Sequence, residues 1–340
     1  MNGYERTMLT LSGEMADYTP SMEIMIDEKI MAQTGHRDYM DFCEFAELDA
    51  VITGTPSSLY RKQMINEQKG VFKNEWGTIR QQGSEVVSAI IGYPIGDIRE
   101  AFKYTAPDPN DEYRFAYLRS LIKRFKNKKL VGMHIHDAFN YPYYLAGMEA
   151  LFVGMFDEPE AVRKLVDISV EHNISLARKA VALGADFILL GDDYGGGNQL
   201  LVSPEKFREF FLPGLQKVVS AVRETGAFCF KHCCGNINAI LDDIVQIGID
   251  VLHPLDPSAG MDILETKLKY PNVVVMGGIN CYEPLCEYSV EALEAETQRV
   301  IETVGRGGRF IIASSNSVHS DVKVENYMAM QRVRKRLAIE

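Results

Sequence analysis

The chain has 340 residues, of which 46% are hydrophobic and 24% charged, and this composition is typical of a globular protein that can bury a large core. Its formal net charge of −11 argues against nucleic acid or an anionic membrane surface as the main partner. We find no signal peptide and no apolar run that reaches the thickness of a bilayer. Five of the six cysteines lie in the last third, which suits reactive or metal-bound thiols in a reducing cytoplasm better than a secreted disulfide framework.

The first 80 residues are the least regular part of the chain. Their pattern predicts a short strand over 22–26, a helix over 27–34 and a hairpin around 72–79. We treat 1–80 as an irregular N-terminal region that supplies the first elements of the fold.

Beyond residue 110, short apolar strands alternate with capped helices. Strands are expected over 130–135, 187–190, 250–252, 273–276 and 310–313, with one more from residue 228, and helices over 111–126, 159–183, 203–226, 237–247, 289–304 and 324–337. Polar residues and glycines gather after the strand ends, as they do where loops build the site of a (β/α)8 barrel. A Rossmann sheet is the main competitor, but no G-x-G-x-x-G follows an early strand. The chain is therefore predicted to be α/β, one TIM-like barrel domain over 1–340.

The clearest chemical signal is the stretch Phe228-Cys229-Phe230-Lys231-His232-Cys233-Cys234-Gly235-Asn236. His232 and Cys234 are two residues apart, so on an extended backbone their side chains leave on the same face. An imidazole beside a thiolate suits zinc. The alternative is that these cysteines are buried and act as small hydrophobic residues.

Other candidates follow the neighbouring strands. Asp192 and Asp193 end a buried strand, and because adjacent strand residues point oppositely, only one should face the site as a proton donor or substrate partner. A carboxylate that caps or orders the loop is the alternative. His136 shares a strand face with His134, and either a ligand or a core histidine fits the pattern. His253 either lines the pocket or orders its own loop.

Several further residues are candidates for substrate binding. Tyr143 belongs to an aromatic run that would wall a flat ligand or simply pack in the core. Asn280 and Asn316 lie in the loops after the two last predicted strands, and we include both, with His136, as candidate substrate-binding residues.

Five blocks, in order and at their spacing, resemble the uroporphyrinogen decarboxylase superfamily, which includes zinc- and corrinoid-dependent methyltransferases. They are Gly191-Asp192-Asp193 followed by 201–208, the block 232–236, the block 253–262, Gly277-Gly278-Ile279 and Val324-Glu325-Asn326. The resemblance runs from about residue 128 to the end and is loose before that. It implies a (β/α)8 barrel whose site lies at the carboxyl ends of the strands.

The superfamily has two enzymatic branches. The decarboxylase binds a substrate with many carboxylates through an early arginine segment, but the corresponding residues 20–27 contain no arginine. The methyltransferases bind zinc through an H-x-C pair, matched by His232 and Cys234, and a late cysteine. The position of that cysteine falls near Asn316, so His319 or Cys281 would supply the third ligand, or the metal has been lost.

The resemblance implies methyl transfer between a small donor (a methyl ether, methylamine or methanol type) and a separate corrinoid protein. Zinc would act as the Lewis acid, and the partner would carry the corrinoid, methylcobalamin in its methylated form. In this interpretation Asp192, Asp193 and His253 are the catalytic candidates. Two alternatives stay open, a decarboxylase-like enzyme and a non-catalytic barrel that binds a ligand or the corrinoid protein.

Overall fold

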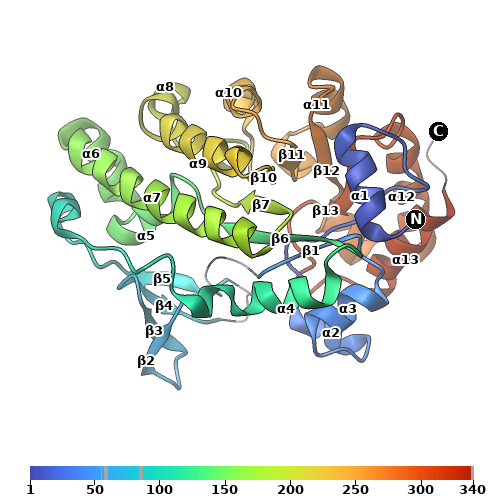
Figure 1. Ribbon diagram of the computed structural model, residues 1–340, viewed down its shortest axis with the longest axis horizontal. Coiled ribbons are helices and arrows are strands. Elements are labelled where there is room, and N and C mark those ends of the chain that lie inside the picture. Colours follow the sequence, from blue (N-terminus) through green and yellow to red (C-terminus); the bar gives the residue numbers. More distant parts are fainter. Residues whose placement is uncertain (55, 57–59, 84–86, 338–340) are drawn as a thin grey trace.

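The computed structural model describes residues 1–54, 56, 60–83 and 87–337. Its centre is a parallel sheet of seven strands, surrounded by helices (Figure 1). In spatial order the strands are β1 (Ala50–Ile52), β6 (Leu130–Ile135), β7 (Phe187–Leu190), β10 (Phe228–His232), β11 (Val251–His253), β12 (Val274–Ile279) and β13 (Phe310–Ser314). The order of these strands across the sheet is the same as their order along the chain, and neighbouring strands pair in parallel. This is the arrangement predicted from alternating strands and helices.

The segment Pro20–Met22 bridges the two edges of this curled sheet. On one side the Ile312 N–H donates to the Pro20 carbonyl at 2.9 Å, and on the other the Asp49 N–H donates to the Ser21 carbonyl at 2.9 Å. The segment therefore takes the eighth position, and the predicted barrel is confirmed. The strand expected over 22–26 is wrong in detail, because only Ser21 and Ile26 form isolated bridges there and no continuous ladder develops.

Helices cover the outside of the barrel (Figure 1). They are α4 (Ala116–Phe125), α5 (Asn140–Ala146), α6 (Met148–Asp157), α7 (Pro159–Leu183), α9 (Leu212–Glu224), α10 (Leu241–Gln246), α11 (Ile263–Lys269), α12 (Val290–Thr303) and α13 (Val324–Arg336). The helix predicted over 203–226 is interrupted, because α8 (Pro204–Lys206) passes into a π-helical turn at Phe207–Phe211 before α9 begins. Pro213 has no N–H and cannot complete the regular α-helical pattern at this point.

The N-terminal region adds the helices α1 (Gly3–Ser12), α2 (Glu28–Gln33) and α3 (Tyr39–Phe45). The predicted helix over 27–34 corresponds to α2, whereas α1 and α3 were not predicted. Tyr4 N–H donates to the Lys128 carbonyl just before β6, so α1 lies at the amino ends of the strands, the end opposite the predicted site. Within the described residues no helix is long and apolar enough to cross a membrane.

Two hydrophobic cores lie on the two faces of the sheet. Ile188 and Leu190 pack against the helices, while Phe187 and Leu189 fill the interior of the barrel with residues of the other strands. Gly132 belongs to this interior, where a Cβ would lie 2.2 Å from the Phe187 ring, so the glycine makes room for the ring. The positions facing the interior change from apolar to polar at the carboxyl ends of the strands.

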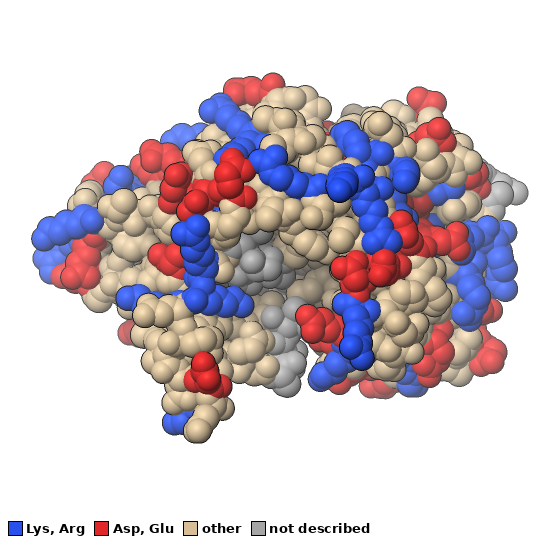
Figure 2. Space-filling view, turned by 60° about the horizontal axis from the view of Figure 1, so that its bottom comes forward, with Lys and Arg blue, Asp and Glu red and all other residues tan. Residues whose placement is uncertain are grey.

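A second, antiparallel sheet stands beside the barrel (Figure 1). It contains β2 (Lys62–Asn66), β3 (Val71–Asn74), β4 (Ile79–Gln81) and β5 (Ala89–Gly92) in sequence order. The hairpin predicted around 72–79 is β3 and β4, and it is extended by one strand on each side. Figure 2 shows the molecule hollowed near this sheet, with lysine and arginine side chains along the edge of the hollow.

Candidate functional site

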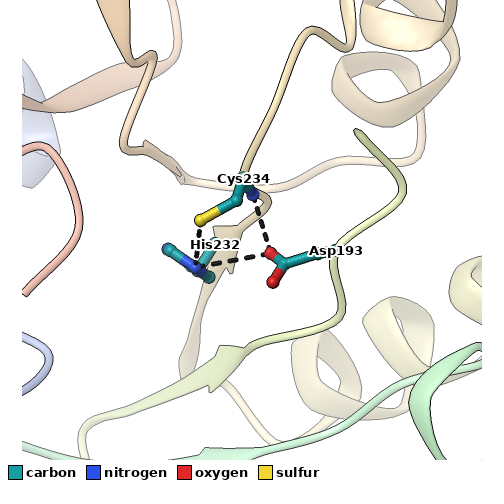
Figure 3. A group of neighbouring side chains, drawn as sticks. All are labelled: Asp193, His232 and Cys234. Carbon is teal, nitrogen blue, oxygen red and sulfur yellow. Dashed lines mark hydrogen bonds and ion pairs between the residues drawn. The ribbon is translucent and has the colours of Figure 1, made fainter. Parts of the chain in front are cut away.

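Three potential metal ligands, Asp193, His232 and Cys234, meet at the carboxyl ends of β7 and β10 (Figure 3). His232 Nε2 lies 3.2 Å from Cys234 Sγ and 3.4 Å from Asp193 Oδ1. All three ligand atoms lie within 4.8 Å of one another. The period of two along β10 places His232 and Cys234 on one side, as the sequence predicted, and Asp193 completes the group from the neighbouring strand.

The loops after β7 and β10 approach each other closely at this point. Cys234 N–H donates to Asp193 Oδ1 at 2.7 Å, which fixes the carboxylate beside the thiol. The approach requires glycine, because a Cβ on Gly195 or Gly235 would lie 2.5 Å from the backbone of the opposite loop, and Gly235 also has a φ of 79°. These glycines hold the two ligand-bearing loops together.

His253 determines which nitrogen of His232 faces the group. Its Nε2 donates to the Ser314 carbonyl at 3.1 Å, so in a neutral ring its Nδ1 must accept. That Nδ1 lies 2.7 Å from His232 Nδ1, which therefore carries the proton and donates. Burial and the Lys231 cation lower the pKa of His232 to about 3, so its ring is neutral and its Nε2 presents a lone pair to Cys234 and Asp193.

The donor set and its spacing fit zinc. Zinc binds Cys sulfur at about 2.3 Å and His nitrogen or carboxylate oxygen at about 2.0 to 2.2 Å, so tetrahedral ligands lie roughly 3.4 to 3.6 Å apart. The separations of 3.2 and 3.4 Å in this group are close to that value. Burial, followed by the neighbouring Asp193, raises the pKa of the Cys234 thiol well above its ordinary value. A bound metal ion would overcome this shift and hold the thiolate.

Asn316 lies near the position at which the resemblance places a late cysteine. Its Nδ2 donates to Cys234 Sγ at 3.1 Å, so the residue reaches the site from the loop after β13. His319 does not join the group: its Nε2 donates to the Cys281 carbonyl at 3.1 Å, and its ring packs on Tyr282. Cys281 is buried against Ser315 and is also absent from the group formed by the described residues. The structure therefore brings Asp193, and neither His319 nor Cys281, to the His232–Cys234 pair.

Asp192 and His136 form a second polar pair beside the first. Asp192 is fully buried and its Oδ1 lies 2.7 Å from His136 Nδ1, while its Oδ2 accepts the N–H groups of Phe139 and Asn140. Burial alone would raise the pKa of Asp192, but His136, Lys231 and these backbone donors lower it below its ordinary value. The carboxylate is ionised, so His136 Nδ1 carries the proton and its Nε2 is free to accept one.

Below this pair lies a buried ion pair that the sequence analysis did not single out. Lys231 Nζ donates to Asp137 Oδ2 at 2.8 Å and to the Asp192 carbonyl at 2.7 Å, and neither charged side chain is exposed. Tyr194 OH donates to the other oxygen of Asp137. Lys231 therefore ties β10 to the loops after β6 and β7 that carry His136 and Asp193.

One cavity of about 410 Å³ collects most of these residues. Its lining includes the predicted residues His136, Tyr143, Asp193, His232, Cys234 and Asn316, together with Arg80, His134, Phe139 and Tyr144. Four predicted residues are not part of its lining: Asp192, His253, Asn280 and His319. Asp192 is buried behind His136, and His253 is buried behind His232. His319 lies farther along the loop that carries Asn316 and bonds to the Cys281 carbonyl, and Asn280 Oδ1 accepts the Tyr282 N–H at 2.8 Å within its own loop.

His134, which the sequence analysis paired with His136 on one strand face, also lines the cavity. Arg80 was not among the sequence-based candidates, because it comes from β4 in the poorly patterned N-terminal region. Gly191 leaves space for His134, because a Cβ there would lie 2.0 Å from His134 Nε2.

The family model for uroporphyrinogen decarboxylase matches residues 3–337. The chain belongs to the uroporphyrinogen decarboxylase family. The match extends through the N-terminal region, where the resemblance in sequence motifs was loose, and so the family assignment covers nearly the whole chain.

Curated relatives include methyltransferases as well as decarboxylases. The chain is 28% identical to methylcobamide:CoM methyltransferase MtaA of Methanosarcina barkeri over 169 residues, covering 50% of this chain and 47% of the relative. It is 25% identical to MtbA of Methanosarcina acetivorans over 237 residues, covering 68% and 66%, and 23% identical to uroporphyrinogen decarboxylase of Shewanella amazonensis over 321 residues, covering 87% and 84%. The matched part spans about half the length of the first of these relatives.

Among solved structures, a methyltransferase from Methanosarcina mazei superposes with a TM-score of 0.79 at 17% identity, covering 99% of both chains. The agreement over the full length shows that the two share the same fold, including the region before residue 80. Both kinds of relative are enzymes by name, and the family assignment supports an enzyme here as well.

Proposed function

We propose that the chain is a methyltransferase that moves a methyl group between a small methyl donor and a corrinoid protein. The observation that carries the proposal is the group of Asp193, His232 and Cys234, whose ligand atoms lie within 4.8 Å of one another inside the shared cavity. The MtaA and MtbA relatives, which are named methylcobamide:CoM methyltransferases, support it further.

His232, Cys234 and Asp193 would hold zinc, with His253 orienting His232. Bound there, zinc supplies Lewis acidity toward a donor heteroatom or stabilises a thiolate. Asp193 would take the place of the late cysteine as the third ligand, and Asn316 donates to Cys234 Sγ and partly offsets the negative charge on sulfur. An aspartate oxygen in place of a thiolate leaves the metal less electron-rich, which favours the Lewis-acid role toward an ether or alcohol oxygen.

His136 would handle the proton that methyl transfer from a neutral donor requires. When the C–O or C–N bond of the donor breaks, the electron pair stays on the heteroatom, and the methyl group goes to the corrinoid of the partner. His136 Nε2 can accept or deliver a proton because Asp192 holds Nδ1–H and stabilises the charged imidazolium. Phe139, Tyr143 and Tyr144 would exclude water and pack against the donor.

The test is whether the purified, zinc-loaded protein methylates cob(I)alamin. The reaction is measured by the change in absorbance as cob(I)alamin becomes methylcobalamin. Candidate donors are methanol, methylamines and methyl ethers, tested singly. Wild type is expected to support methylation from at least one donor, and Cys234→Ala to abolish it. Cys229→Ala is a matched control, because Cys229 is a buried thiol on the opposite face of the same strand.

Absence of methylation from every donor, together with CO2 release from uroporphyrinogen, would instead establish the decarboxylase alternative. The sequence argues against this alternative, because residues 20–27 contain no arginine, whereas the decarboxylases bind a substrate with many carboxylates through arginines in that segment. A protein that binds a corrinoid partner without turning over any donor would establish the non-catalytic alternative.

A further inference from the structure

Arg80 is a buried cation at the cavity that holds the candidate metal ligands. It lies on β4 of the antiparallel sheet, its side chain is 2% exposed, and it lines both the 410 Å³ cavity and an adjoining one of about 840 Å³. Its guanidinium lies 5.1 Å from the centre of the Tyr144 ring. Tyr144 in turn packs against His136, at 5.3 Å between ring centres. The arginine is thus connected through one aromatic ring to the residues of the proposed site.

The hydrogen bonds of Arg80 leave part of the guanidinium unsatisfied. Nε donates to Ser88 Oγ at 2.9 Å and Nη2 donates to the Ser88 carbonyl at 2.8 Å, which fixes the plane of the group. Nη1 is buried and has no hydrogen-bond partner among the residues that the structure describes. Within the described ranges, no aspartate or glutamate forms an ion pair with Arg80. A buried charge without a counterion is costly, and folded proteins pair such charges or use them to bind ligands.

A second unsatisfied group lies in the same cavity. His134 is 6% exposed, and neither of its ring nitrogens has a hydrogen-bond partner among the residues that the structure describes. Its backbone is fixed by the Thr53 hydroxyl at 3.1 Å and its ring rests against Gly191, so the ring is held in place. In the described part of the chain, two buried polar side chains from different sheets therefore carry unpaired nitrogen atoms at one cavity, and a polar ligand would satisfy both.

We propose that the small substrate of this site carries a carboxylate, which Arg80 Nη1 binds while His134 donates a hydrogen bond to the same molecule. This inference rests on the proposed function, because the other end of the substrate would be the methyl-bearing heteroatom at His232, Cys234 and Asp193. Tyr143, Tyr144 and Phe139 would contact the apolar body between the two ends. The barrel would thus supply the chemistry, and the antiparallel sheet would select a substrate with an anionic end.

The experiment compares carboxylates with neutral molecules of the same shape. Methoxyacetate and 4-methoxybenzoate are titrated calorimetrically into the zinc-loaded protein, each beside its primary amide. Wild type is expected to bind at least one acid about ten-fold or more tightly than its amide, as a charge-assisted hydrogen bond implies. Arg80→Gln should abolish this preference, and Arg80→Lys should keep part of it.

Lys73→Gln is the matched control, because it removes the same charge from the exposed face of the neighbouring strand β3 and should keep the full preference. If wild type binds neither acid more tightly than its amide, or if the preference survives in Arg80→Gln, the inference is wrong. A crystal structure of wild type with the bound acid tests the same contact without a variant. A carboxylate oxygen at Arg80 Nη1 supports the inference, and a carboxylate bound elsewhere overturns it.

Binding is measured without a corrinoid and without turnover, so the two proposals can fail separately. A preference for the acids with no methylation of cob(I)alamin would reject only the methyl-transfer function. Methylation from neutral donors with no preference for the acids would reject only the carboxylate-bearing substrate.

Discussion

The two walls of the cavity are built in different ways. On the barrel wall the polar side chains at and beside the candidate metal ligands are fixed by one another: His253 holds His232, Cys234 N–H holds Asp193, and Asp192 holds His136. On the wall formed by the antiparallel sheet, Arg80 is fixed through Ser88, but its Nη1 group finds no partner within the described ranges. The first wall is pre-organised within the protein, which suits metal binding and proton transfer. The second is incomplete without a ligand, which suits substrate selection.

The largest expected effect is loss of the metal from the barrel wall. His232→Ala and Cys234→Ala should each reduce zinc from about one ion per chain to a small fraction, because too few ligands remain. Metal content after dialysis measures this. His319→Ala and Cys229→Ala are controls that should keep the metal, since neither side chain belongs to the group. Zinc retained in Cys234→Ala but lost in His319→Ala would reverse the assignment.

The next effect concerns the buried ion pair beneath this wall. Lys231→Met leaves Asp137 buried without its cation, so the free energy of unfolding should fall by about 3 to 5 kcal/mol. Urea denaturation measures the change. The double variant Lys231→Met with Asp137→Leu should recover part of the loss, since no unpaired charge is left. A single variant as stable as wild type would show that this ion pair does not stabilise the barrel wall.

A smaller effect is expected from the residue that orients a ligand. His253→Ala removes the acceptor of the His232 Nδ1 proton, so zinc affinity should fall about 10- to 100-fold while binding remains measurable. A competition titration against a zinc chelator gives the affinity. An unchanged affinity would mean that the His253–His232 contact does not position the ligand, and complete loss of zinc would imply a direct role in coordination.

The smallest expected effect tests whether the two walls are independent. Arg80→Gln should leave the zinc content at the wild-type value, and Cys234→Ala should leave the preference for carboxylates over amides intact. Metal analysis and calorimetry on both variants give the comparison. Loss of zinc in the arginine variant would show that the antiparallel sheet also supports the metal site.

The difference between the walls also explains what could be predicted from sequence. The period of two along β10 places His232 and Cys234 on one side whatever the rest of the fold does, and the same rule indicates that only one of Asp192 and Asp193 lines the cavity. The alternation of strands and helices after residue 110 predicts the barrel for a similar reason. Each apolar segment there has the periodicity of either a strand or a helix, so its type can be predicted locally.

Contacts between distant loops follow no such rule. The choice of His319 rested on its distance in sequence from Asn316, but the loop turns so that Asn316 reaches Cys234 while His319 bonds to the Cys281 carbonyl. Asn280 follows a strand end yet bonds within its own loop, and His253 ends β11 yet bonds to His232 and to the Ser314 carbonyl behind the cavity. Arg80 lies in a sheet of short, polar strands, and its burial depends on packing against the barrel that local pattern does not encode.

X-ray absorption at the zinc edge of the loaded wild-type protein tests the central claim most directly. A site made of His232, Cys234 and Asp193 should show one sulfur ligand at about 2.3 Å and nitrogen or oxygen ligands at about 2.0 to 2.2 Å. Asp193→Cys should add a second sulfur to the spectrum. Two sulfur ligands in wild type would mean that another cysteine completes the site, and no sulfur would show that Cys234 does not bind the metal.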